Sequence, residues 1–295
     1  MAESYTKTVF VNGQAPALSA EELNKMGQGV EDAFEFSRNS VNFLFGNGMD
    51  GNVTISANTN LTRDMYYENL TINSGIKLST NGYKIFVRGT LTNNGIIEAN
   101  GPNGTNGSST DTYTQYSNNG GGSGGGSTSN GGGTSPGFGG NGGNGGRSVY
   151  DATVKTGGAA SYTVAALQSF ELIHNLYNIS PQGGGGGAGG TYNSNPYYSG
   201  GSGGVGGGRV LIYARNIINS GSIEAKGGNG GNGVMNASYW SGGGGGGGGG
   251  FVLLVHNTFT GNEPNVSGGA GGTAYSSTGN GVAGTVGSVR KIKLF

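Results

Sequence analysis

Short apolar runs alternate with polar turns over residues 52–100, and this pattern gives the first expectation for the fold. The runs are rich in β-branched side chains and are separated by Asn-Gly and Ser-Gly pairs; they are Val53–Ser56, Asn69–Ile72, Ile76–Leu78, Lys84–Val87 and Ile96–Glu98. Such runs predict β-strands joined by tight turns. Because the runs are so short, they favour a parallel β-solenoid, whose coils stack on one another, over a conventional sandwich, whose strands are usually longer.

The N-terminal pattern is helical instead. Ser19-Ala-Glu-Glu22 has the form of a capping box, and apolar residues follow it at intervals of three and four, which places them on one stripe of a helix. We expect an amphipathic helix at about 19–36 that docks to a partner through Leu23, Met26, Val30 and Phe34. A further helix is expected at 162–170, whereas 171–178 is compatible with a helix or a strand.

An internal repeat connects the strands to the glycine-rich half of the chain. Lys84–Ala99 aligns without gaps with Val210–Ala225, and a weaker third copy is Phe251–Thr260 followed by Asn265–Gly269. Each copy has the pattern of a strand, a short β-like segment and then a glycine-rich arm. We therefore expect the strands of the copies to stack in one β-layer and the arms to leave that layer as excursions.

The glycine-rich arms are compatible with two opposite states, a flexible tether or an ordered array. The chain has 69 glycines among 295 residues, and Gly242–Gly250 is an uninterrupted run. Elsewhere the residues that interrupt the glycines fall three apart, as in Lys226, Asn229 and Asn232, in Ser267, Ala270 and Thr273, in Ser202 and Val205, and in Phe138, Asn141, Asn144 and Arg147. In a helix with three residues per turn, this spacing places every side chain on one face and leaves bare backbone on the others. The spacing favours packed polyglycine II helices. Arms of matched length on either side of a loop predict antiparallel pairs, namely Gly183–Thr191 with Ser199–Gly208 and Lys226–Gly233 with Gly242–Gly250.

Together these patterns predict a mainly β fold with irregular extended structure. It consists of a short-strand parallel β-solenoid-like core, packed polyglycine II helices and one short N-terminal α-helix. The expected organisation is an attachment segment at 1–48, a β-solenoid-like region at 49–100, and a glycine-rich region of stacked strands and arms at 101–295.

Composition and charge narrow the function mainly by exclusion. Charged residues make up 10% of the chain with no net charge, which argues against a nucleic-acid partner, and no apolar run approaches the length of a membrane span. The only histidines, His174 and His256, adjoin apolar strand-like residues and are interpreted as structural. Glu98 and Glu224 share one repeat position and are similar to the paired carboxylates of solenoid glycosidases, but a solvated edge is favoured because nothing nearby in sequence suggests a sugar cleft. We expect no catalytic residue, no cofactor and no metal site.

Aromatic residues gather in the segments between the glycine arms. They are Tyr113, Tyr116, Tyr192, Tyr197, Tyr198, Tyr239, Trp240 and Tyr275. Large rings beside Ser and Asn, presented on loops of a rigid scaffold, are typical of a recognition surface. The alternative is that the rings fold back over the glycine core, which has little other apolar surface. The two interpretations are compatible, because some rings can anchor while others contact a ligand.

The glycine-rich half resembles the distal adhesins of the long tail fibres of T-even-type bacteriophages, in the segments Gly101–Arg147, Gly183–Gly208, Lys226–Gly250 and Gly268–Gly287. That resemblance implies a sandwich of extended glycine helices whose variable loops bind the host surface. Val9–Val30 resembles the N-terminal modules of many bacteriophage tail proteins, which have an apolar strand, a turn and a Leu-Asn-Lys segment. The solenoid-like region at 52–100 departs from the adhesin pattern and implies a self-contained tail protein.

The expected function is that of a non-catalytic receptor-binding or tail-fibre protein, made in the host cytoplasm and carried on the virion tail. The expected partners are a host-surface protein or glycan at the aromatic loops and other tail proteins at the N-terminus. A homotrimer is compatible with this arrangement, and no membrane insertion is expected. The alternatives, in order, are a purely structural virion protein such as a capsid-decorating or fibre-shaft component, an ice-binding protein and a solenoid hydrolase.

Overall fold

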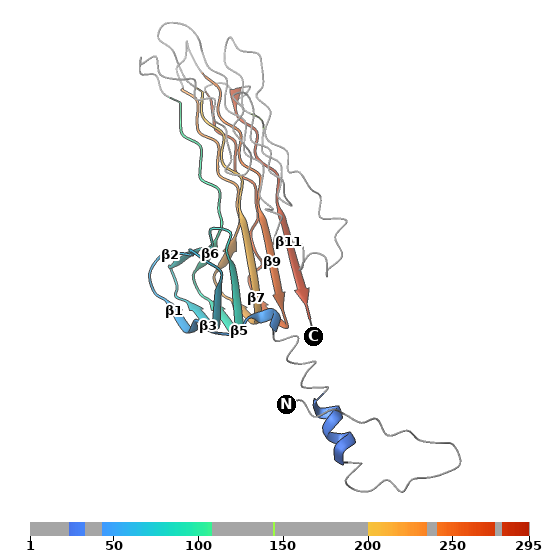
Figure 1. Cartoon of the computed structure of the whole chain (residues 1–295). Helices are drawn as coiled ribbons and strands as arrows, with labels where there is room; N and C mark the ends of the chain where they lie inside the picture. The colour runs from blue at the N-terminus through green and yellow to red at the C-terminus, as the bar shows by residue number, and fades with distance from the viewer. Residues whose placement is uncertain are drawn as a thin grey trace, which may run out of the picture. The chain divides into compact units, whose positions relative to one another are not determined.

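The structure, a computed structural model, describes residues 24–32, 43–107, 144, 200–234, 241–274 and 279–294. The described part is mostly β-structure in parallel sheets, with a single short α-helix at 24–32, which confirms this much of the predicted fold (Figure 1). The ends predicted for that helix, and the helix expected at 162–170, lie outside the described residues. The chain divides into two compact units, Met1–Leu44 and Phe45–Phe295.

The larger unit contains two parallel β-sheets. In chain order the elements are η1 (Phe43–Phe45), β1 (Gly51–Ile55), β2 (Thr59–Asn60), β3 (Met65–Ile72), β4 (Lys77–Ser79), β5 (Lys84–Asn93), β6 (Ile96–Glu98), β7 (Arg209–Asn219), β8 (Ser222–Glu224), β9 (Phe251–His256), β10 (Thr258–Gly261) and β11 (Ser288–Lys293). The seven-stranded sheet has the order β1-β3-β5-β7-β9-β11, with β10 paired to β7. The four-stranded sheet has the order β2-β4-β6-β8. The apolar runs predicted at 52–100 all overlap strands of these sheets.

The chain alternates between the two sheets as it advances, with β3 followed by β4, β5 by β6 and β7 by β8. The repeat predicts this stacking, and β5, β7 and β9 are neighbours in one sheet. The gapless alignment of Lys84–Ala99 with Val210–Ala225 is wrong by one residue before Thr90, because it places Lys84 opposite Val210 whereas Lys84 pairs with Leu211. From Thr90, which pairs with Asn216, the alignment is correct. The cause is a β-bulge, in which two residues of β5 occupy the place of one residue of β7.

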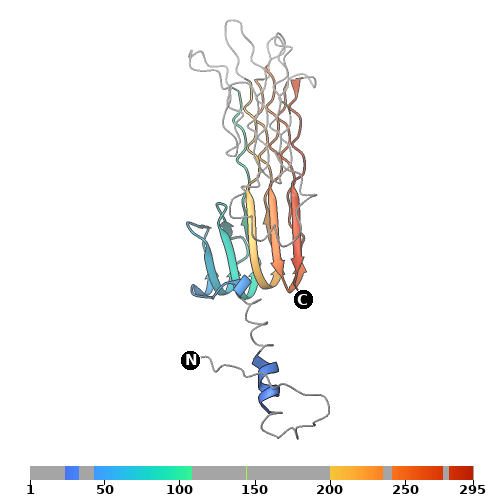
Figure 2. The same cartoon turned by 45° about the vertical axis from the view of Figure 1, so that its right-hand side comes forward.

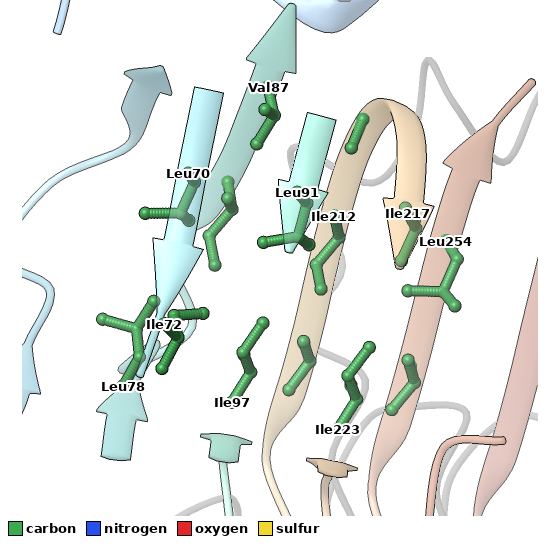
Figure 3. Packing of buried hydrophobic residues seen from close by; sticks show 14 of the residues in the cluster. Leu70, Ile72, Leu78, Val87, Leu91, Ile97, Ile212, Ile217, Ile223 and Leu254 are labelled. Atoms are coloured by element: carbon green, nitrogen blue, oxygen red, sulfur yellow. The ribbon is translucent and has the colours of Figure 1, made fainter. Parts of the chain in front are cut away.

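A continuous apolar core lies between the sheets, because alternate side chains of each strand point inward. Rows of equivalent residues stack along the sheets: Leu70, Leu91 and Ile217 in one row, and Leu78, Ile97 and Ile223 in another (Figure 3). All of these side chains are 0% exposed. In Figure 3, β7 turns over between Ile212 and Ile217, so that both residues reach the same core.

The outer face of the seven-stranded sheet carries a row of aromatic rings. Tyr66, Phe86 and Tyr213 occupy paired positions of β3, β5 and β7, and their ring centroids stack 4.8 and 4.9 Å apart. The chain before β1 crosses this row closely, since a Cβ added at Gly46 would lie 2.8 Å from the Cβ of Phe86. The neighbouring Phe45 is fully buried. The segment before β1 is therefore anchored on the aromatic row.

Extended glycine-rich arms link the two sheets. We call 101–107, 226–234 and 267–274 the outgoing arms, and 200–208, 241–250 and 279–287 the returning arms. Both views show the described arms side by side beyond β7, β9 and β11 (Figures 1 and 2). The returning arms lead directly into β7, β9 and β11.

Backbone hydrogen bonds between the arms recur at every third residue. Along one outgoing arm, the N–H groups of Gly227, Gly230 and Gly233 donate to the carbonyls of Ser267, Ala270 and Thr273 on the next outgoing arm. Along one returning arm, Gly244 and Gly247 donate to Gly231 and Gly228, so this arm lies antiparallel to the outgoing arm 226–234. The matched lengths of these two arms predicted this antiparallel contact, whereas Gly183–Thr191, one arm of the other predicted pair, lies outside the described residues. The bare faces of each arm are thus used to bond different neighbours.

The arms approach so closely that side chains are excluded where they face one another. Residues 241–250 are all buried. A Cβ added at Gly247 would lie 2.5 Å from the carbonyl carbon of Val205, and one at Gly244 would meet Ser202 in the same way. Ordinary contacts of a Cβ begin near 3.4 Å. Backbone contact on two sides therefore explains six of the nine glycines in the run, namely Gly243, Gly244, Gly246, Gly247, Gly249 and Gly250.

Candidate functional site

The arms end together, on the side away from the sheets (Figure 1). Backbone bonds near these ends join Gly107 to Asn232, Gly233 to Thr273, Gly201 to Gly242 and Gly243 to Gly279. We define the arm ends as residues 105–107, 200–202, 232–234, 241–243, 273–274 and 279–280. Because the chain is covalently continuous, the segments 108–199, 235–240 and 275–278 each start and finish at this surface.

Side-chain hydrogen bonds fix the arm ends to one another. The Oγ of Ser241 accepts from the Val234 N–H at 2.8 Å, and the Ser241 N–H donates to the Val234 carbonyl at 3.2 Å. The Ala274 N–H donates to Oδ1 of Asn280 at 2.8 Å. Ser241 is fully buried and Ala274 is 9% exposed. The two short connections, 235–240 and 275–278, therefore begin and end on residues that hold each other in place.

Asparagine side chains extend this bonding along the outgoing arms. Oδ1 atoms of Asn100, Asn103 and Asn106 accept from the N–H groups of Lys226, Asn229 and Asn232, each at 2.8 Å. Asn229 and Asn232 in turn accept from the N–H groups of Ala270 and Thr273 at 2.8 and 2.9 Å. The spacing of three predicted only that these side chains share one face. The structure shows that the asparagines at these positions also accept hydrogen bonds from the backbone of the next arm, and the recurrence of asparagine at every third residue could have indicated this in the sequence.

The aromatic residues predicted to bind a receptor lie outside the described residues; they are Tyr113, Tyr116, Tyr192, Tyr197, Tyr198, Tyr239, Trp240 and Tyr275. Their segments are nevertheless anchored on described positions. Trp240 directly precedes Ser241, and Tyr275 directly follows Ala274, so both adjoin buried arm-end residues in sequence. The arm ends are therefore the described surface on which the predicted binding segments are mounted.

The N-terminal helix exposes part of its predicted docking stripe. Met26 is 47% exposed and Val30 is 70% exposed, one helical turn apart. Elsewhere on the helix, Nε2 of Gln28 donates to Oδ1 of Asp32 at 2.8 Å. Leu23 and Phe34, the other residues of the stripe, lie outside the described residues.

Glu98 and Glu224 occupy paired positions of β6 and β8, as the repeat predicts. Nδ2 of Asn100 donates to both carboxylates, at 3.0 Å to Glu98 and 2.9 Å to Glu224. Lys226 lies 2.8 Å from Glu224, and Lys77 lies 3.7 Å from Glu98. The glutamate side chains are only 19% and 13% exposed, so the prediction of a solvated edge is wrong. The residues form a part-buried cluster of ion pairs and hydrogen bonds, because the register stacks like charges that need shared partners.

The electrostatics of Glu224 favour the ionised form. Burial raises the pKa of Glu224, but hydrogen bonds from Lys226, Asn100 and Ser222 outweigh burial and hold the pKa below its usual value. A general acid in a glycosidase needs a raised pKa instead. Glu224 therefore has the protonation behaviour of an ion-pair partner.

His256 is buried in an apolar setting at the end of β9. It is 6% exposed, neither ring nitrogen has a hydrogen-bond partner, and its ring centroid lies 5.8 Å from that of Phe259. Burial, and then the nearby charge of Lys291, lower the pKa of His256. A neutral imidazole in this position is a packing residue. His174 lies outside the described residues.

Within the described ranges, no group of three or more His, Cys, Asp or Glu side chains could hold a metal ion. None of the helical residues described belongs to a helix long and apolar enough to cross a membrane. Comparison of the chain with protein-family models, with curated proteins and with solved structures finds no match.

Proposed function

We propose that this protein is a non-catalytic bacteriophage tail-fibre adhesin, which binds a host-surface protein or glycan through the aromatic segments mounted on the arm ends. The observation that carries the proposal is their common anchoring. The connections 108–199, 235–240 and 275–278 start and finish on one hydrogen-bonded surface. Aromatic rings held on a rigid base suit recognition, because little conformational freedom is lost when they bind.

The scaffold of the proposed adhesin is a parallel β-solenoid from which polyglycine II helices extend. The alternation of the chain between the sheets, and the stacked rows of core residues, support the solenoid. Hydrogen bonds at every third residue and the close approach of the backbones support helices with three residues per turn. Main-chain bonds hold such an array together, so the connecting segments can change in sequence without disturbing it.

Attachment to the virion tail is assigned to the N-terminal segment. The exposed Met26 and Val30 support a role for the helix in docking to other tail proteins, in a trimer or another oligomer. Several copies on one tail would hold a cell more tightly than one copy, because linked contacts raise the effective concentration of each further contact.

The experiment is the labelling of a panel of bacterial strains with a fluorescent fusion of the full chain. The test variant combines Tyr239→Ser with Trp240→Ser. Its matched control is Tyr83→Ser, which removes an aromatic ring that is 38% exposed and belongs to the turn between β4 and β5. We expect the wild type and the control to label the same subset of strains, and the double variant to lose labelling with an unchanged melting curve.

Three other results would count against the proposal in different ways. If the wild type labels no strain, a structural virion component is the better interpretation. If the double variant labels as strongly as the control, the site lies elsewhere. If the double variant melts at a much lower temperature, the rings cover the glycine core instead of facing a receptor.

Ice binding is a second candidate function, and the outer positions of the outgoing arms favour it. Asn103, Asn229 and Ala270 lie side by side across the arms, and Asn106, Asn232 and Thr273 repeat the row three residues further on. Three residues of such a helix advance about 9 Å, so the face is a regular grid in which every listed side chain except that of Ala270 is polar. Thermal hysteresis of the full chain that is lost in Asn229→Lys would support this function, and the absence of hysteresis in the wild type would remove it.

A further inference from the structure

A groove lies where the first outgoing and returning arms meet the sheets. Its volume is about 370 Å³, and it is lined by residues of three stretches, 79–82, 98–102 and 205–209. The third stretch is far from the other two in sequence, and all three belong to the described part of the chain. The volume is at the small end of the range of about 300–1,000 Å³ that is typical of ligand sites.

The groove exists because two successive links between the sheets differ in length. After β4 the chain turns at once into β5, with the Tyr83 N–H donating to the Thr80 carbonyl at 2.9 Å and Asn81 at φ +50°. After β6 the chain instead leaves along the arm 101–107, and the arm 200–208 returns into β7. The tight turn between β4 and β5 does not extend beside the long arms, so open space is left between that turn and the bases of the arms. The groove is therefore produced by the topology of the stack.

Both signs of charge line this groove. Glu98 supplies a carboxylate, and Arg209 supplies a guanidinium whose Nε donates to the Gly82 carbonyl at 3.1 Å. The Ser79 hydroxyl lies 3.5 Å from Oε1 of Glu98. Asn81 also lines the groove, with its Nδ2 donating to the Leu61 carbonyl at 2.9 Å. Carboxylate oxygens accept several hydrogen bonds each, so Glu98 has acceptor capacity beyond its contacts with the protein.

The remaining lining is apolar or bare backbone. Pro102 and Val205 supply apolar surface, and Gly206 and Gly208 present backbone without side chains. An anion bound here would meet Glu98, and a cation would meet Arg209. A wholly apolar ligand would displace water from both charged groups without offering them a hydrogen bond in return. A neutral ligand with hydroxyl groups and an apolar face satisfies all of these surfaces.

We propose that this groove binds one neutral sugar unit of a glycan. The site is distinct from the arm ends, because Gly101 and Gly107 are separated by roughly 19 Å of extended chain. It therefore does not depend on the function proposed for the aromatic segments. Glu98 accepts hydrogen bonds from sugar hydroxyl groups, and the Pro102–Val205 surface packs against the C–H face of the ring.

Ligand-observed saturation-transfer NMR on the full chain tests the proposal, with the methyl glycosides of glucose, galactose, mannose and N-acetylglucosamine as probes. Glu98→Gln removes the carboxylate from the groove. The matched control is Glu224→Gln, which changes the glutamate at the same position of the next repeat, bonded to the same Asn100 but outside the groove. We expect at least one glycoside to bind, Glu98→Gln to weaken it by about tenfold or more, and Glu224→Gln to leave it within about twofold.

Ser79→Ala provides a second variant with its own control. Should Glu98→Gln fail to fold, Ser79→Ala must weaken binding while Ser222→Ala, on β8 and outside the groove, leaves it unchanged. The proposal is overturned if none of the glycosides binds the wild type, or if both glutamate variants behave alike. It is also overturned if the Tyr239→Ser and Trp240→Ser double variant abolishes the signal, because the sugar would then bind at the arm ends. Loss of strain labelling without loss of glycoside binding would separate the two sites.

Discussion

Replacing Gly247 by alanine tests whether the glycine run at 242–250 is an ordered array. The Gly247 N–H donates to the Gly228 carbonyl, and the Gly247 carbonyl accepts from the Gly269 N–H, both at 2.8 Å. An added Cβ would lie against the Val205 carbonyl group, 2.5 Å from its carbon. Because non-bonded carbon atoms prefer separations of about 3.5–4.0 Å, the two arms would have to move apart by roughly 1 Å.

The expected magnitude follows from these contacts. Overpacking a well-packed site costs about 1–3 kcal/mol, and weakening two backbone hydrogen bonds adds about 1 kcal/mol each. The smaller freedom of the unfolded alanine chain offsets about 0.4–1 kcal/mol of this loss. The free energy of unfolding should therefore fall by about 2–4.6 kcal/mol. For a unit of this size, that change lowers the Tm by about 4–18 °C.

The assay is thermal unfolding followed by circular dichroism, with two graded controls. Gly208→Ala should cost much less, because the nearest atom to its Cβ would be the Ala99 carbonyl oxygen at 3.1 Å. Gly29→Ala, in the helix at 24–32, has no atom within 4 Å of the new Cβ and should not lower the Tm. A Gly247→Ala protein that melts with the wild type would refute the ordered array, since a tether is insensitive to one added methyl group.

The remaining predictions concern single hydrogen-bonding and titrating groups. Asn219→Ala removes the Oδ1 atom that accepts a 2.7 Å hydrogen bond from the buried Nδ2 of Asn93. The free energy of unfolding, measured in urea, should fall by about 1–3 kcal/mol. The control Ser220→Ala, at an exposed position, should lower it by less than about 0.5 kcal/mol. Asn229→Ala removes the acceptor of the Ala270 N–H at an exposed position, so water replaces it and the same assay should show a loss of only about 0.5–1 kcal/mol; a loss as large as that of Asn219→Ala would contradict this. Because the pKa of His256 is lower in the folded protein than in the unfolded chain, the unfolded chain takes up a proton at a higher pH than the folded protein does. The contribution of His256 to the free energy of unfolding should therefore be full above about pH 6.5 and should fall as the pH drops below that value. Melting curves from pH 7 to pH 5 should be flatter for His256→Phe, and equal slopes would show that another group is responsible.

The strands at 52–100 could be predicted because alternation of apolar and turn residues is a local signal. The bulge between β5 and β7 could not, because its only mark is Gly89 in an ordinary turn-like Arg-Gly pair. A Cβ at Gly89 would lie 2.8 Å from the Glu68 carbonyl oxygen, a contact with the preceding strand of the sheet. The constraint on Gly89 is therefore non-local, and the repeat alone aligns the residues before the bulge one position out of register.

The groove could not be predicted from the sequence either, because the contacts that form it are also non-local. Ser79 and Arg209 come together only because the long excursion after β6 returns onto β7, which pairs with β5 in the other sheet. The sequence around Glu98 contains no sign of a cleft, and the predicted solvated edge followed from that. The structural role of Ser241 at the arm ends was not predicted for another reason. A serine beside a run of glycines is also typical of a flexible linker.

If the arms are the polyglycine II helices proposed above, the period of three sets the steps in which they can change in length. On the outgoing arm 226–234, Asn229 and Asn232 occupy an outer position, and the glycines between them bond neighbouring arms through their backbone. Inserting three residues into an outgoing arm and three into its returning partner lengthens both by about 9 Å and keeps every face in phase. Inserting one residue rotates the rest of the arm by a third of a turn and drives side chains into the backbone contacts that only glycine fits. The arm ends can therefore move away from the sheets in steps of one turn, while the register of β7, β9 and β11 continues to hold the arms in line.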